Sequence, residues 1–115
     1  MSDGRRQASR TDLTGDDLDR AAALVKVLDT RTRLEILLLL AEEEMMVHQL
    51  VAELGKSQPL VSQHLRVLRA AGLVTSARKG REVLYALAEP GIIAIIAELA
   101  AIVDPLPTTP KPKRD

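Results

Sequence analysis

The sequence contains no cysteine, no phenylalanine and no tryptophan, and its single tyrosine is Tyr85. Without thiols the chain can form neither disulfides nor thiolate metal sites, and it cannot sense oxidants through cysteine. Without large aromatic side chains its core must be aliphatic, and no platform exists on which single-stranded bases could stack. These absences exclude disulfide-stabilised proteins, thiol-based sensors and aromatic single-strand binders.

Long apolar runs and catalytic groups are also scarce. The longest apolar run, residues 36–41, is much shorter than the roughly 18 residues that a membrane span requires, and no signal-peptide pattern is present. We therefore expect a cytoplasmic protein without a membrane partner. Ser62 and His64 are the nearest approach to a nucleophile and a base, but two positions in a helix differ by about 200° of rotation. With no glycine-rich phosphate loop either, we expect no enzyme.

The charged residues are distributed unevenly, although the net charge at pH 7 is zero. Residues 1–55 contain 7 basic and 11 acidic side chains, and residues 82–115 contain 3 basic and 5 acidic ones. Residues 56–81 contain 6 basic side chains and no acidic one. A protein that binds a polyanion needs a local basic surface rather than a basic total. This central segment is therefore the candidate for contact with nucleic acid.

The segment from Ser57 to Gly72 has the boundaries and the two sides of an amphipathic helix. Ser57 is a typical N-cap, Pro59 suits the first turn and Gly72 suits a left-handed C-cap, which together predict a helix over residues 58–71. Its apolar side consists chiefly of Val61, Leu65 and Leu68. Its other side has no carboxylate and carries Gln58, Ser62, Gln63, Arg66 and Arg69. Such a side can hydrogen-bond to bases and phosphates in the major groove of DNA, although a solvated helix surface can have the same composition.

The rest of the chain predicts a mainly α-helical domain, residues 14–103, with a small β-hairpin. Polar tails at 1–13 and 104–115 are expected to be disordered. Periodicity and capping predict helices at 14–29, 30–41, 48–54, 58–71 and 90–103, a short strand or an extended link at 45–47, and strands at 73–77 and 82–87 around a basic tip at 78–81. The expected inner stripe of the second helix is Leu34, Leu37, Leu38 and Ala41. The order is therefore α-α-(β)-α-α-β-β-α.

Two short helices joined at Gly55 and Lys56 have the form of a helix-turn-helix, and the basic hairpin follows directly. This succession is typical of a winged helix, in which the second helix enters the major groove of double-stranded DNA and the wing contacts the flanking backbone or minor groove. Each part alone has an ordinary explanation, a helix corner or a solvated turn. A winged helix that binds proteins, or one that binds DNA architecturally without sequence preference, remains compatible with the pattern.

Three motifs carry a resemblance to a known family. They are Ser-x-x-x-Val-Ser-x-His-Leu at 57–65, Gly-Arg-x-x-x-Tyr-x-Leu at 80–87, and Arg-Leu-Glu-Ile-Leu at 33–37. With these motifs the sequence, over roughly residues 17–103, resembles the ArsR/SmtB family of bacterial regulators. The resemblance implies a homodimeric, nucleoid-associated winged-helix repressor that binds an operator and is released by an inducer.

The resemblance also implies which residues contact the operator. Gln58 and Gln63 suit the edge of adenine, and the basic side chains suit phosphates. The implied set is Ser57, Gln58, Ser62, Gln63, His64 and Arg66 on the helix, with Arg78, Lys79 and Arg81 on the wing. His64 lies towards the apolar side of its helix, so it is either a DNA contact or a packed side chain.

In the family, the first and last helices form the dimer interface. The corresponding residues here are Leu18, Ala21, Ala22, Val25, Ile92, Ile95, Ile96, Leu99 and Ile102. The apolar surface of these two helices exceeds what a monomer of this size could hide. The isoleucines also have a simpler explanation, an ordinary core helix.

Many members of the family bind a metal, but the residues at the usual positions do not match. Met46 and His48 replace a Cys-x-Cys pair before the third helix, too few donors for tetrahedral Zn²⁺, although thioether and imidazole suit Cu(I). The positions of the last-helix site hold Glu89, Gly91, Ile102 and Pro105. We therefore predict no cofactor, regard Met46 and His48 as weak metal candidates, and expect an unidentified inducer that does not act on thiols.

Overall fold

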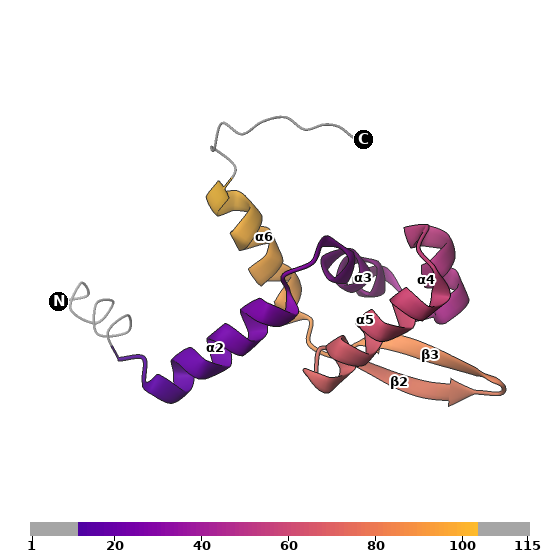
Figure 1. Ribbon diagram of the computed structural model, residues 1–115, viewed down its shortest axis with the longest axis horizontal. Coiled ribbons are helices and arrows are strands. Elements are labelled where there is room, and N and C mark those ends of the chain that lie inside the picture. Colours follow the sequence, from indigo (N-terminus) through magenta and orange to yellow (C-terminus); the bar gives the residue numbers. More distant parts are fainter. Residues whose placement is uncertain (1–11, 104–115) are drawn as a thin grey trace.

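The computed structural model describes residues 12–103 (Figure 1). Residues 1–11 and 104–115, which contain nearly all of the two predicted tails, lie outside this range. The elements are α2 (Gly15–Val27), α3 (Arg31–Glu42), β1 (Met45–Met46), α4 (Val47–Leu54), α5 (Gln58–Ala70), β2 (Val74–Lys79), β3 (Glu82–Leu87) and α6 (Gly91–Val103). This order confirms the predicted α-α-(β)-α-α-β-β-α arrangement.

Side-chain caps begin the first two helices, as their sequences predict. In α2 the Thr14 hydroxyl accepts from the amide of Asp17 at 3.1 Å, and the Asp17 carboxylate accepts from the amide of Thr14 at 2.9 Å. These bonds satisfy amides that have no partner within the helix. In α3 the Thr30 hydroxyl accepts from the amide of Arg33 at 3.2 Å. The two helices therefore meet at a corner between Val27 and Thr30.

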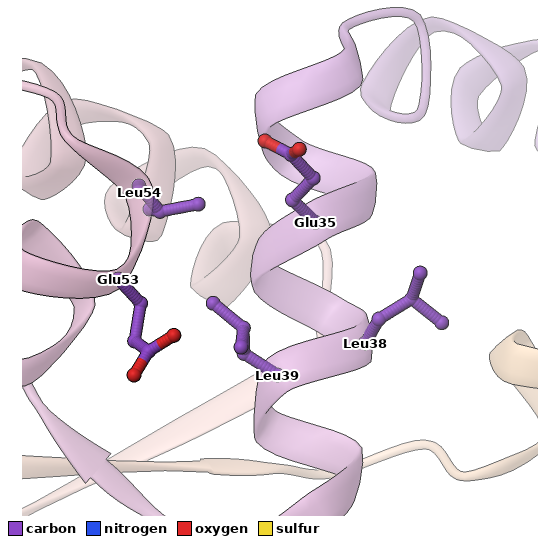
Figure 2. A pocket seen from close by; sticks show the side chains of 5 residues that line it. All are labelled: Glu35, Leu38, Leu39, Glu53 and Leu54. Carbon is purple, nitrogen blue, oxygen red and sulfur yellow. The ribbon is translucent and has the colours of Figure 1, made fainter.

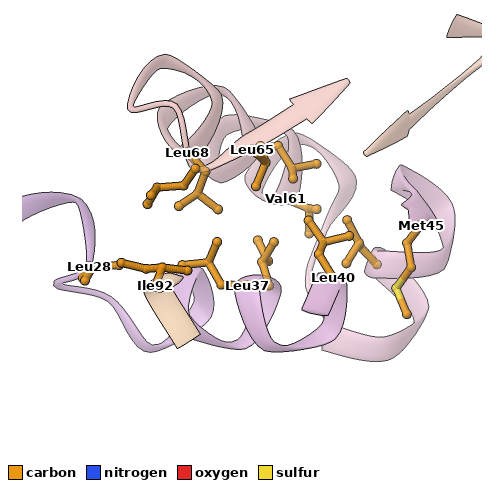
Figure 3. Packing of buried hydrophobic residues seen from close by; sticks show 12 residues of the cluster. Leu28, Leu37, Leu40, Met45, Val61, Leu65, Leu68 and Ile92 are labelled. Atoms are coloured by element: carbon orange, nitrogen blue, oxygen red, sulfur yellow. The ribbon is translucent and has the colours of Figure 1, made fainter. Parts of the chain in front are cut away.

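The core is aliphatic and lies between α3, α4, α5 and the sheet, with one residue from α6 (Figure 3). Val61, Leu65 and Leu68 are fully buried, so the predicted apolar side of α5 is confirmed. The predicted stripe of α3 is right for Leu37, which is buried, and for Leu34, which packs against the core. It is wrong for Leu38 and Ala41, which are exposed, because Ile36 and Leu40 are buried instead. The full cluster is Leu28, Ile36, Leu37, Leu40, Met45, Leu50, Val61, Leu65, Leu68, Leu73, Val74 and Ile92.

The three strands form one antiparallel sheet in the order β1-β3-β2. Met45 pairs with Tyr85 in β1 and β3, and Val74 pairs with Leu87 at the base of the β2–β3 hairpin. At the tip, Lys79 pairs with Glu82 and leaves a two-residue turn in which Gly80 has a φ of 65°. The turn is tighter than predicted, since two-residue hairpin turns use a positive φ that matches the strand twist. Lys79 and Arg78 therefore belong to β2 and not to the loop.

The helix-turn-helix consists of α4 and α5. Gly55 follows α4 with a φ of 67°, a left-handed conformation that glycine adopts without strain. Its amide donates to the carbonyl oxygen of Val51 at 2.9 Å and so ends α4. Figure 1 shows α4 and α5 beside α3, the hairpin projecting beyond the helices, and α2 and α6 extending away on the other side. The hairpin and the two outer helices are thus at different ends of the molecule.

Candidate nucleic-acid interface

Helix α5 exposes the polar residues that the sequence assigns to DNA. Ser57 is its N-cap, and the hydroxyl accepts from the amide of Leu60 at 3.4 Å. Gln58, Gln63 and Arg66 are exposed, and Ser62 is half-buried beside them. None of the described acidic residues lies between Lys56 and Arg81. The outer side of α5 therefore offers hydrogen-bond donors, amide oxygens and positive charge to a duplex, with no carboxylate of its own to repel phosphates.

A shallow hollow of about 240 Å³ lies on the C-terminal half of α5 and is lined by Arg66, Arg69 and Ala70. Two of the three lining side chains are arginines, and a guanidinium is well suited to bind a phosphate. Arg69 also lies in the last turn of α5, where its charge is favourable with the helix dipole. Arg69 is thus a further candidate for a backbone contact.

The hairpin carries the second group of predicted residues. Arg78, Lys79 and Arg81 are all exposed, and Figure 1 shows the hairpin projecting from the molecule. Alternate residues of a strand point to opposite faces, so Arg78 and Lys79 in β2 lie on different faces of the wing. A duplex on one face would therefore be contacted by only one of these two side chains.

His64 is half-buried and bonded within the protein. Its Nδ1 atom accepts a hydrogen bond from Nε of Arg33 in α3 at 3.1 Å. A guanidinium nitrogen of Arg33 also donates to the carbonyl oxygen of Val27 at 3.0 Å and lies 3.7 Å from a carboxylate oxygen of Asp29. Sequence reasoning missed Arg33 as a functional residue, because no local pattern pairs positions separated by 31 residues.

The weak metal candidates are not part of a cluster of ligands. His48 Nδ1 lies 3.4 Å from a carboxylate oxygen of Glu82, and Met46 is half-buried. Within residues 12–103, no group of three or more His, Cys, Asp or Glu side chains is placed to hold a metal ion. The donor set around His48 therefore does not fit the tetrahedral metal sites of the family, and the absence of a cofactor stays a prediction.

The two outer helices expose much of their apolar surface. Leu18, Val25, Ile95, Leu99 and Ile102 are exposed, as are Ala21 and Ala22, and Ile96 is half-buried. No residue of α2 is buried. The assignment of Ile92 to this surface is wrong: it is only 1% exposed and packs in the core, because it lies in the first turn of α6, next to the domain.

A second hollow lies between α3 and α4 (Figure 2). It measures about 210 Å³ and is lined by Glu35, Leu38, Leu39, Glu53 and Leu54. Pockets that enclose a small organic ligand usually measure about 300–1,000 Å³. This hollow is smaller and open, so it does not identify an effector. Among the helices of residues 12–103, none combines the length and the apolar character needed to cross a bilayer.

A helix-turn-helix followed by an antiparallel hairpin, with a basic surface over both, defines a winged-helix protein of the DNA-binding class. Residues 30–76 match the family described as bacterial regulatory protein, arsR family. The HTH-type transcriptional repressor SmtB of Mycobacterium tuberculosis is 48% identical over 84 residues, which cover 73% of this chain and 62% of the relative. The transcriptional regulator CmtR of the same organism is 39% identical over 82 residues, which cover 71% of this chain and 70% of the relative. The chain belongs to the ArsR family, and these relatives are named as regulators and not as enzymes.

Two solved structures share the fold. The transcriptional repressor BigR of Xylella fastidiosa is similar with a TM-score of 0.71 and 32% identity, over 81% of this chain and 94% of that chain. The homodimeric winged helix-turn-helix domain Mb0332 of Mycobacterium bovis is similar with a TM-score of 0.66 and 31% identity, over 76% and 81% of the two chains. The present chain spans less than two thirds of the length of the SmtB relative.

Proposed function

We propose that this chain is a sequence-specific transcriptional repressor that binds double-stranded operator DNA as a homodimer. Helix α5 enters the major groove, and the wing at residues 78–81 contacts the flanking backbone or minor groove. The observation that carries this proposal is the exposed, carboxylate-free side of α5, continued by the basic hairpin. The similar proteins SmtB and BigR are both named as repressors, which supports the same role for this chain.

Different residue types on this surface contact different parts of the DNA. Gln58 and Gln63 read base edges, because a carboxamide donates and accepts at once, as adenine requires. Arg66 and Arg81 contact phosphates and set the register of the protein on the duplex. Ser57 and Ser62 add hydroxyl contacts at the start of α5.

The homodimer forms through α2 and α6. Exposed leucines, valine and isoleucines on these helices form an apolar surface of the kind that monomers rarely leave in water. The similar Mb0332 domain is homodimeric, which supports the same assembly here. Two copies of α5 would then contact two successive major grooves on one side of the duplex.

Release from the operator depends on an inducer that does not act through a cysteine of this chain, since the chain has none. The ligand sets typical of metal-sensing relatives are not reproduced at Met46 and His48.

Footprinting of the purified protein on the promoter of its own gene tests this function. A repressor with paired recognition helices should protect a pseudo-palindromic site whose half-sites are about 34 Å apart, or a small multiple of that distance. An architectural binder would give uniform protection without a preferred site. A protein-interaction module would give no protection at all, and either result would refute the proposal.

Two substitutions separate base contacts from phosphate contacts. Gln63→Ala should lose about 1–3 kcal/mol of discrimination at one base position. Arg81→Ala should weaken all sequences alike and reduce the dependence of log affinity on log salt by about one. Arg31→Ala, which removes an exposed arginine bonded to Glu35 on α3, is the control. If Gln63→Ala and Arg81→Ala both bind like Arg31→Ala, the assigned roles are wrong.

A further inference from the structure

Arg33 connects the end of the first outer helix to the recognition helix. Its guanidinium donates to the carbonyl oxygen of Val27 at the C-terminal end of α2, at 3.0 Å. Its Nε atom donates to Nδ1 of His64 in the middle of α5, at 3.1 Å. The side chain is only 17% exposed, and Asp29, at 3.7 Å, partly balances its charge. The Arg33 guanidinium is thus hydrogen-bonded on both sides and links α2, one of the outer helices, to α5.

The bond from Arg33 determines where the proton of His64 resides. A guanidinium has only donors, so the Nδ1 atom that it faces must present a lone pair. Neutral His64 therefore carries its proton on Nε2. Among residues 12–103 no protein group bonds to that Nε2 atom, and the residue is partly open to solvent. The ring is therefore bonded through Nδ1 to Arg33, and its Nε2–H group is free to donate to a group outside the protein.

The charges around His64 keep it neutral. Burial lowers the pKa of the imidazole below its ordinary value of 6.5, and the positive charges of Arg33 and Lys56 lower it further. Arg33 bonds to the ring from α3, and Lys56 belongs to the turn before α5. A protonated His64 would lose the acceptor that Arg33 requires. The Nε2–H form is thus favoured at neutral pH.

We propose that Arg33 is a positioning residue of the DNA-binding surface: it joins the end of α2 to α5 and holds His64 in the Nε2–H form, which donates to a phosphate oxygen of the duplex. This inference rests on the proposed function as far as the duplex is concerned. A phosphate is the fitting acceptor, because His64 lies beside the packed side of α5 and not at the centre of its exposed side. His64 is then both packed and a DNA contact, two roles that the sequence presents as alternatives.

The contact itself is tested without DNA, by nitrogen NMR of the full chain labelled at histidine. His64 should show a protonated Nε2 and an unprotonated Nδ1 at pH 7.5. Arg33→Gln should raise the pKa of His64 and mix the two tautomers. Arg31→Gln removes the same charge from the same helix but bonds only Glu35, and it should change neither property. A tautomer and a pKa that are the same in Arg33→Gln and Arg31→Gln would overturn the proposal.

The effect on DNA is measured with the duplex protected in the footprint and with a random duplex of equal length. Arg33→Gln should weaken both about three- to tenfold, the value of one hydrogen bond, with no change in the salt dependence. His64→Asn keeps an acceptor near the Nδ1 position but lacks the Nε2 donor, so it should lose a similar factor. The double variant should bind no worse than either single one, because both changes remove the same contact.

Each other result contradicts one identifiable claim. If Arg33→Gln reduces the salt dependence by about one, Arg33 itself contacts a phosphate and is not a positioning residue. If Arg33→Lys binds like the wild type, charge and not the two-sided geometry matters, which also overturns the proposal. If the wild-type protein binds both duplexes equally, sequence-specific repression fails, while the random duplex still tests the phosphate contact. His64→Asn, at a half-buried position that keeps an acceptor for Arg33, provides this test even if the Arg33 variants do not fold.

Discussion

The surroundings of the His64 ring make the stability of the fold depend on pH. In the folded chain the pKa of His64 is lowered by burial, by Arg33 and by Lys56 from its ordinary value of 6.5. In the unfolded chain these influences are absent. Between the two pKa values the unfolded chain binds more protons, so the free energy of unfolding increases with pH. The contribution of His64 is complete above about pH 6.5 and is lost as the pH falls through the lowered pKa of the folded state.

We therefore expect the wild-type chain to lose stability between pH 7.5 and pH 5.5, and His64→Gln to lose less over the same interval. Urea unfolding at several pH values measures this difference, with His48→Gln, which removes the other histidine, as the control. Asp17, whose pKa is lowered by its bonds to the amide and hydroxyl of Thr14, titrates in a more acidic range. Parallel pH curves for wild type and His64→Gln would show that His64 is not desolvated as described.

At the scale of the elements, α5 combines a structural side and a functional side in a single helix. Leu65 is completely buried, whereas Leu60, five positions earlier in the same helix, is 40% exposed. Leu65→Ala should destabilise the domain by about 2–5 kcal/mol, because it leaves a cavity in a closely packed core. Leu60→Ala should cost about 1 kcal/mol or less. Chemical denaturation measures both, and equal losses would contradict the orientation of α5.

The wing depends on the backbone of one residue. Gly80 has a φ of 65°, and a Cβ atom added there would meet nothing within 4 Å. The cost of a side chain is therefore conformational and not steric. Gly80→Ala should destabilise the hairpin by about 1 kcal/mol, and Gly80→Asn by less, because asparagine tolerates the left-handed region. Thermal unfolding compares the two variants, and the prediction fails if alanine is tolerated better than asparagine.

The elements of this fold are predictable because local signals agree with tertiary structure. Thr14, Thr30 and Ser57 cap their helices in the structure as in the sequence, and Gly80 lies in the turn of the hairpin. In α3 the prediction fails, since Leu34 to Leu40 is apolar almost throughout and its composition gives no clear phase. Helix α3 packs against β3, α4, α5 and α6, and this packing buries Ile36, Leu37 and Leu40.

The site is predictable to the extent that it lies within one element. The exposed side of α5 and the basic wing follow from spacing along the chain, and their exposure agrees with the structure. The bond between Arg33 and His64 could not be predicted from spacing along the chain, because it depends on how α3 packs against α5. Ile92 illustrates the same limit, because an isoleucine is suited both to a dimer interface and to a core. Its position in the first turn of α6, next to the domain, determines that it is buried in the core.

At the scale of the whole molecule, α2 requires an explanation beyond the single chain. The helix has 13 residues and none of them is buried, although Leu18 and Val25 would gain free energy by leaving water. An isolated helix of this length is marginal in water. The capping box at Thr14 and Asp17 stabilises its start, but caps alone contribute only about 1 kcal/mol. A partner subunit that covers the apolar side of α2 would supply the missing burial, and α6 presents a similar surface.

A charge placed on this surface should therefore separate the subunits without unfolding them. Val25 is 64% exposed and Ile102 is 70% exposed, so neither Val25→Glu nor Ile102→Glu disturbs the core of one chain. Light scattering after gel filtration should give the wild type twice the 12.5 kDa mass of the chain, and both variants the mass of a monomer. Ala52→Glu, on the exposed side of α4, adds the same charge elsewhere and should remain dimeric.

The monomeric variants should also bind an operator with two half-sites more weakly than the wild type does, and bind a single half-site equally well. The reason is that linking two recognition helices raises the effective concentration of the second one on the duplex. If Val25→Glu and Ile102→Glu both stay dimeric, the subunits pair through another surface, and the exposed apolar side of α2 needs a different partner.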